Sequence, residues 1–76
     1  MRRAGAVVRT AQGVAIVRSP DDTYPDIGTE LVDDSLADVG RVVDVFGPVE
    51  EPYLAVSPAE GVRLAGLVGT PLYARD

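Results

Sequence analysis

The chain has 76 residues, a formal net charge of −5 and 46% hydrophobic residues, which is typical of one small globular domain rather than a disordered segment. No apolar run approaches the ~18 residues that cross a bilayer, and the uncharged stretch after Arg3 is too short for a signal peptide. The absence of cysteine excludes disulfides and thiolate metal sites. We therefore expect a single domain over residues 1–76, in the cytoplasm, with no membrane partner.

The charged residues are unusual, because all seven basic side chains are arginines and they face 12 carboxylates. Such a surface repels phosphate, which disfavours direct binding of a nucleic-acid backbone as the main activity. Two explanations for the composition compete: GC-rich codon bias with an ordinary acidic surface, or a salt-rich cytoplasm in which dense carboxylates keep a protein soluble. The second accounts for more of the pattern.

Short valine-rich runs, punctuated by eight glycines and six prolines, predict an all-β domain. The first two runs form a hairpin whose loop ends at Gly13, where a positive φ costs little. A loop over Ser19–Asp26 contains two prolines and three aspartates, which suit turns. Residues 61–69 fit either a short helical turn or a covered loop. The predicted strands are Ala4–Arg9, Val14–Arg18, Thr29–Val32, Val39–Phe46, Tyr53–Ser57 and Pro71–Arg75.

Six short strands without a long helix to cover them are best buried by closing the sheet on itself, since closure removes the exposed edges. The predicted architecture is therefore a small closed six-stranded barrel. Alternation along the strands assigns the interior to Val8, Val14 or Val17, Val43, Val45 and Leu54.

The chain has no histidine, cysteine, lysine or tryptophan, which removes the usual general base, thiol nucleophile and most transition-metal ligand sets. Its adjacent carboxylates lie in predicted turns, where neighbouring side chains point apart. The loop from Asp21 to Asp26 lacks the ligand spacing of a calcium loop. We predict no catalytic residue, no metal and no cofactor, and hence a binding module rather than an enzyme.

One segment has the features of a binding surface. Phe46, the only phenylalanine, precedes a Gly47-Pro48 turn, and Pro52 follows, so the loop has few conformations to lose on binding. If the alternation of the preceding strand holds, Phe46 points out of the barrel. A β-bulge near Gly47 would instead return it to the core. In the outward case an apolar patch forms from Phe46, Val49, Pro52 and Tyr53.

A family resemblance is carried by the run Val39-Gly-x-Val-x-Asp-Val-Phe-Gly-Pro-Val-x-x-Pro-Tyr-x-x-Val56, and extends to Gly28, residues 31–33, Gly69 and residues 72–73. It resembles the central motif of the Gar-type subunit of archaeal and eukaryotic H/ACA ribonucleoproteins, which guide the isomerisation of uridine to pseudouridine in RNA. The resemblance implies a Greek-key barrel. With the acidic composition, it also implies an archaeal protein from a halophile.

The resemblance further implies a non-catalytic role. The Gar-type subunit docks on the dyskerin-type pseudouridine synthase subunit, meets guide RNA only indirectly through the complex, and helps target RNA load and product leave. The nucleophilic aspartate then belongs to the partner. Carried onto this sequence, the partner-binding residues are Val39, Gly40, Val43, Phe46, Gly47, Pro48, Val49, Pro52 and Tyr53.

Two alternatives remain at this point. A Naf-type assembly factor shares the barrel and the docking surface, but normally carries long extra segments that this sequence does not contain. A small barrel that binds RNA directly needs basic and aromatic residues on one face. Four aromatic rings and a charge of −5 make that function less compatible with the sequence.

Overall fold

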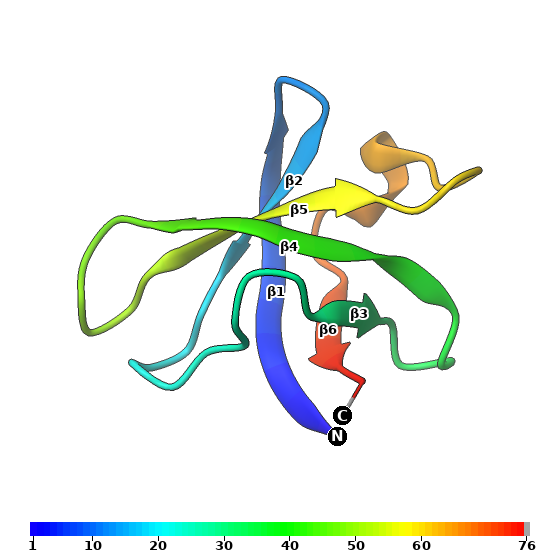
Figure 1. Cartoon of the computed structure of the whole chain (residues 1–76). Coiled ribbons are helices and arrows are strands. Elements are labelled where there is room, and N and C mark those ends of the chain that lie inside the picture. Colours follow the sequence, from blue (N-terminus) through cyan, green and yellow to red (C-terminus); the bar gives the residue numbers. More distant parts are fainter. Residues whose placement is uncertain (76) are drawn as a thin grey trace.

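The computed structural model describes residues 1–75 and forms one closed barrel of six antiparallel strands (Figure 1). The elements in chain order are β1 (Arg2–Ala11), β2 (Val14–Arg18), β3 (Glu30–Val32), β4 (Asp38–Phe46), β5 (Tyr53–Pro58), a 3₁₀ turn η1 (Leu64–Leu67) and β6 (Pro71–Ala74). All six predicted strands are present. The ambiguous segment 61–69 contains the short helical turn, and no helix in the described chain is long and apolar enough to cross a membrane.

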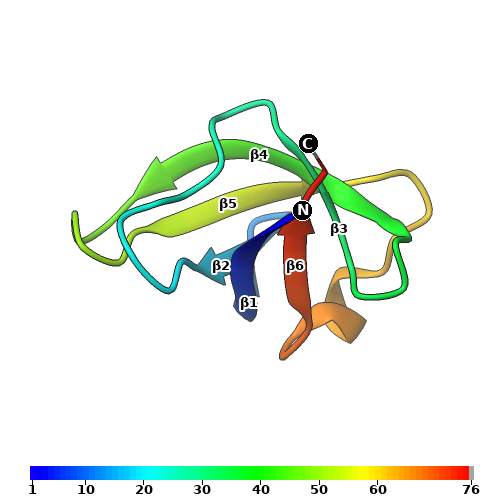
Figure 2. The same ribbon diagram turned by 90° about the horizontal axis from the view of Figure 1, so that it is seen from below.

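The strands follow each other around the barrel in the order β1-β2-β5-β4-β3-β6. Strands β3, β4 and β5 form consecutive antiparallel pairs, and β6 returns to lie between β3 and β1. Four strands connected in this way are a Greek key, so the expected topology is confirmed. Figure 2 shows β4 and β5 side by side over β1, β2 and β6.

The barrel interior is filled by small aliphatic side chains. No aromatic ring belongs to it among the described residues, and Leu64 and Leu67 of η1 pack against it from one end. This placement explains why a four-residue turn is apolar, because it closes an opening that short strands leave. The core cluster is Ala4, Val7, Ala15, Val17, Leu31, Val39, Val42, Leu54, Val56, Leu72 and Ala74.

The predicted interior was only partly correct. Of its members, the structure buries Val17 and Leu54, half-buries Val14 and Val45, and exposes Val8 and Val43. Val45 nevertheless packs against the core cluster. The assignments of Val8 and Val43 to the interior were therefore wrong.

Both errors have the same cause, a β-bulge. In β4 the register with β5 shifts between Val42 and Asp44, so Val43 is an extra residue. In β1 the register with β2 shifts in the same way around Val8. A bulge places two residues opposite one and resets the alternation. Val42 therefore fills the barrel, Val43 faces outward, and Val45 faces inward again.

Local turn chemistry agrees with the sequence. Gln12 and Gly13 both have positive φ (51° and 83°), as a two-residue hairpin turn requires. The Asp33 carboxylate ends β3 by accepting hydrogen bonds from the backbone N–H groups of Ser35 (2.9 Å) and Ala37 (3.0 Å). These aspartate-rich segments form turns because the side chain replaces a backbone acceptor.

Candidate functional site

The loop between β4 and β5 extends from one end of the barrel, where the segment joining β2 to β3 also lies (Figures 1 and 2). The Ser19 backbone N–H donates to the Pro52 carbonyl oxygen (2.9 Å) and fixes one end of the loop to that segment. Gly47 has a φ of 90°, and a Cβ there would lie 2.8 Å from Cδ2 of Tyr53. A glycine is thus needed both for the turn and for the position of the tyrosine ring.

Phe46 and Tyr53 face each other across the last register pair of β4 and β5. Their ring centroids are 5.6 Å apart and their planes differ by 25°, so the rings are stacked. Phe46 remains 39% exposed and lies outside the core cluster. The bulge in β4 falls before Val45 rather than near Gly47, so it does not return Phe46 to the interior. The outward orientation is the one the structure has.

The nine residues implied by the resemblance divide into two groups along β4. Phe46, Gly47, Pro48, Val49 and Tyr53 gather at the loop end, where Val49 is 82% exposed. At the other end of the strand, Val39 is buried in the core and Gly40 is half-buried. Pro52 is buried where the loop meets β5, and Val43 is exposed between the two groups.

Gly40 lies where β4 and β5 approach closely. A Cβ at this position would overlap the carbonyl oxygen of Ser57 on the paired strand. Its backbone φ is not positive, so the need for glycine comes from space rather than conformation. The residue that the resemblance placed in a docking surface therefore also has a structural role.

We expect Gly40→Ala to lower the free energy of unfolding by about 1–3 kcal/mol, since the strands must separate to admit the methyl group. Urea denaturation followed by circular dichroism measures this. Gly66→Ala is the matched control, because a Cβ there meets no atom and φ is not positive. An equal effect of the two substitutions would show that the close approach to Ser57 does not matter.

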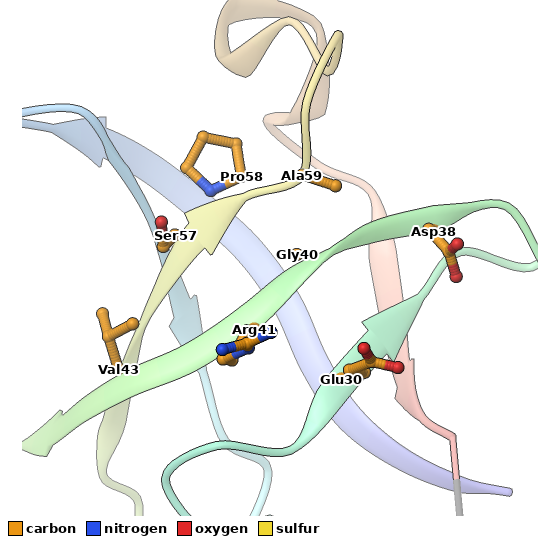
Figure 3. A pocket seen from close by; sticks show the side chains of 8 residues that line it. All are labelled: Glu30, Asp38, Gly40, Arg41, Val43, Ser57, Pro58 and Ala59. Atoms are coloured by element: carbon orange, nitrogen blue, oxygen red, sulfur yellow. The ribbon is translucent and has the colours of Figure 1, made fainter.

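A hollow of about 320 Å³ lies beside this close approach (Figure 3). The Asp38 carboxylate in its wall accepts a hydrogen bond from Nη2 of Arg75 (3.0 Å). Within residues 1–75, no three acidic side chains converge as a metal site would need. In Figure 3, Val43 and Ser57 lie toward one side of the hollow, and Glu30 and Asp38 toward the other. The lining residues are Glu30, Asp38, Gly40, Arg41, Val43, Ser57, Pro58 and Ala59.

Sequence reasoning missed one residue of the aromatic site. The Arg9 guanidinium carbon lies 5.8 Å from the centroid of the Tyr53 ring, in cation–π geometry. Arg18, on the strand beside Tyr53, donates to Oε1 of Glu51 (2.9 Å). Both partners of that ion pair are exposed, so it contributes less than about 1 kcal/mol to stability. No local sequence signal links Arg9 to Tyr53, because β1 and β5 are distant in the sequence and β2 lies between them in the barrel.

A family model described as "Gar1/Naf1 RNA binding region" matches residues 1–76. The chain belongs to this family. Among its relatives are two proteins named "H/ACA ribonucleoprotein complex subunit GAR1". The one from Debaryomyces hansenii is 29% identical over 59 residues, and the one from Chaetomium globosum is 24% identical over the same length. These matches cover 78% of the chain but only 27% and 28% of the relatives, so the chain spans about a quarter of their length.

A solved structure of the same fold is titled "Structure of the Gar1 domain of NAf1". It superimposes with a TM-score of 0.72 over 97% of this chain and 81% of that one, at 12% sequence identity. The likeness confirms the barrel fold of the Gar1/Naf1 family. The chain thus has the barrel fold of the Gar1/Naf1 family, is homologous to H/ACA subunits, and carries a stacked aromatic pair at the rim of the barrel.

Proposed function

We propose that this chain is a non-catalytic subunit of an H/ACA ribonucleoprotein that binds the pseudouridine synthase subunit and promotes loading and release of the target RNA. Membership of the Gar1/Naf1 family over the whole chain supports the assignment, as do two relatives named as H/ACA subunits. Guide RNA is then met through the complex rather than through this chain.

The observation that carries the proposal is the exposed Phe46–Tyr53 stack beside a loop held by Gly47 and Pro48. Aromatic side chains supply large contact area at interfaces and dominate their energetics. A loop with restricted backbone torsions loses little entropy when a partner covers it. The rim of the barrel thus has the side chains and the rigidity that a stable protein contact requires.

A non-catalytic role agrees with how the carboxylates are used. The Asp21 side chain accepts a hydrogen bond from the Thr23 backbone N–H (2.7 Å), and the Asp33 side chain accepts two such bonds. These groups stabilise turns on the surface. With no histidine, cysteine or lysine in the sequence, we assign the chemistry of uridine isomerisation to the partner.

The test is complex formation between the purified chain and the synthase subunit in the absence of RNA, measured by size-exclusion chromatography with light scattering. We expect a 1:1 complex that persists at high salt, because apolar contacts are not screened. Two separate peaks under these conditions would overturn the proposal. A shift of guide RNA by this chain alone, persisting at high salt, would favour direct RNA binding instead.

A further inference from the structure

Two residues of the central strands are buried although they point away from the barrel interior. Ile16 and Ala55 form a register pair between β2 and β5. Their chain neighbours belong to the core cluster and they do not, so alternation places both on the outer face. Ile16 is nevertheless only 4% exposed. An aliphatic side chain is thus covered on the outside of the sheet.

The two bulges place an exposed valine on each side of this covered pair. Because a bulge sets two residues opposite one, Val43 and Asp44 oppose Ala55, and Val8 and Arg9 oppose Ile16. Val8 is 41% exposed and Val43 is 44% exposed. A row of four aliphatic residues therefore crosses four strands on the outer face, covered in the middle and exposed at both ends, and we call it the valine row: Val43, Ala55, Ile16 and Val8.

The valine row is continuous with the aromatic pair. Ala55 lies two residues after Tyr53 on the same face of β5. Arg9 stands opposite Ile16 and reaches the Tyr53 ring, so its aliphatic stem passes over the outward face of β2. The exposed Phe46 and the half-buried Tyr53 thus adjoin a second apolar strip that ends at β1.

This surface carries one charged side chain at each end, Asp44 beside Val43 and Arg9 beside Val8. Within residues 1–75 the Arg9 guanidinium makes no ion pair, although the chain carries 12 carboxylates. A guanidinium held over a ring still has all its N–H donors available for a carboxylate, which it can bind through two parallel hydrogen bonds. The position therefore suits an acidic side chain brought by another protein.

We propose that the synthase subunit covers the valine row as well as the Phe46–Tyr53 pair, and that it places a carboxylate against Arg9. This inference rests on the proposed function. The contact then spans β4, β5, β2 and β1 instead of the β4–β5 loop alone. The two bulges gain a role, since each turns a valine outward at one end of the row.

The test is isothermal titration of the synthase subunit with four variants of this chain, without RNA. Val8→Asp should weaken binding by about tenfold or more, whereas Val68→Asp, a similar change at an exposed valine beside η1, should not. Arg9→Glu should weaken binding about tenfold, and Arg63→Glu, which changes the net charge equally, should have little effect.

Thermal unfolding of each variant keeps loss of folding apart from loss of binding. If Val8→Asp and Arg9→Glu bind as tightly as their controls while the unchanged chain forms the complex, the larger contact is wrong and the proposed function stands. If the unchanged chain forms no complex, both proposals fall. Weakening by Arg9→Glu that equals that of Arg63→Glu would assign the effect to net charge and overturn the pairing.

Discussion

Val42→Asp is expected to unfold the barrel, while the same substitution at Val43 is expected to leave it folded. Val42 is fully buried in the core cluster, and no basic side chain belongs to that cluster. An unpaired carboxylate there costs several kcal/mol in desolvation. Domains of this kind are stable by only about 5–15 kcal/mol, so the loss removes most of the stability. Val43, 44% exposed on the bulge, can present a carboxylate to water.

The comparison is direct because the two residues are neighbours of the same type. Far-ultraviolet circular dichroism during heating measures the midpoint for each variant and for the unchanged chain. The expected result is no cooperative transition for Val42→Asp and a midpoint within a few degrees of the unchanged chain for Val43→Asp. The opposite order would show that β4 has simple alternation and no bulge.

Phe46→Ala is expected to weaken the complex with the synthase subunit by about tenfold or more, which corresponds to about 1.4 kcal/mol. The substitution removes Phe46, the more exposed ring of the stacked pair, and leaves Tyr53 without its stacking partner. Stability should fall by about 1 kcal/mol, because the lost stacking is partly exposed to solvent. The substitution is therefore expected to lower the affinity for the synthase subunit more than it lowers the free energy of unfolding.

Titration calorimetry and urea denaturation on the same preparation separate the two effects. Val68→Ala is a suitable control, since this exposed valine lies beside η1. An unchanged affinity for Phe46→Ala would remove the aromatic pair from the interface. A loss of stability as large as the loss of affinity would instead make Phe46 a residue of the fold.

The fold was predictable because its signals are local. Glycine and proline positions delimit the strands, and Gly13 marks the first hairpin turn correctly. The bulges were not predictable, because a bulge is a relation between two strands and Val42-Val43 offers either valine to the core. Their effect was large, because in each strand the bulge places the first valine of a Val-Val pair in the barrel interior and the second, which was predicted to be inside, on the outer face.

The candidate site was predictable only where its residues lie close together in the sequence. The Gly47-Pro48 loop and the two alternative orientations of Phe46 are features of one hairpin, and the structure has the outward orientation of the two. The place of Arg9 and Ile16 depends on β2 pairing with β5, which barrel closure decides across distant segments. Sequence spacing carries no information on that pairing.

In the proposed complex the synthase subunit covers the rim formed by Phe46, the loop and Tyr53. Hydrogen–deuterium exchange of this chain, with and without saturating synthase subunit and in the absence of RNA, tests this contact without any substitution. We expect slower exchange over residues 46–53 and no change over 59–63, a partly exposed turn elsewhere on the barrel. Unchanged exchange over residues 46–53 in a saturated complex would contradict it.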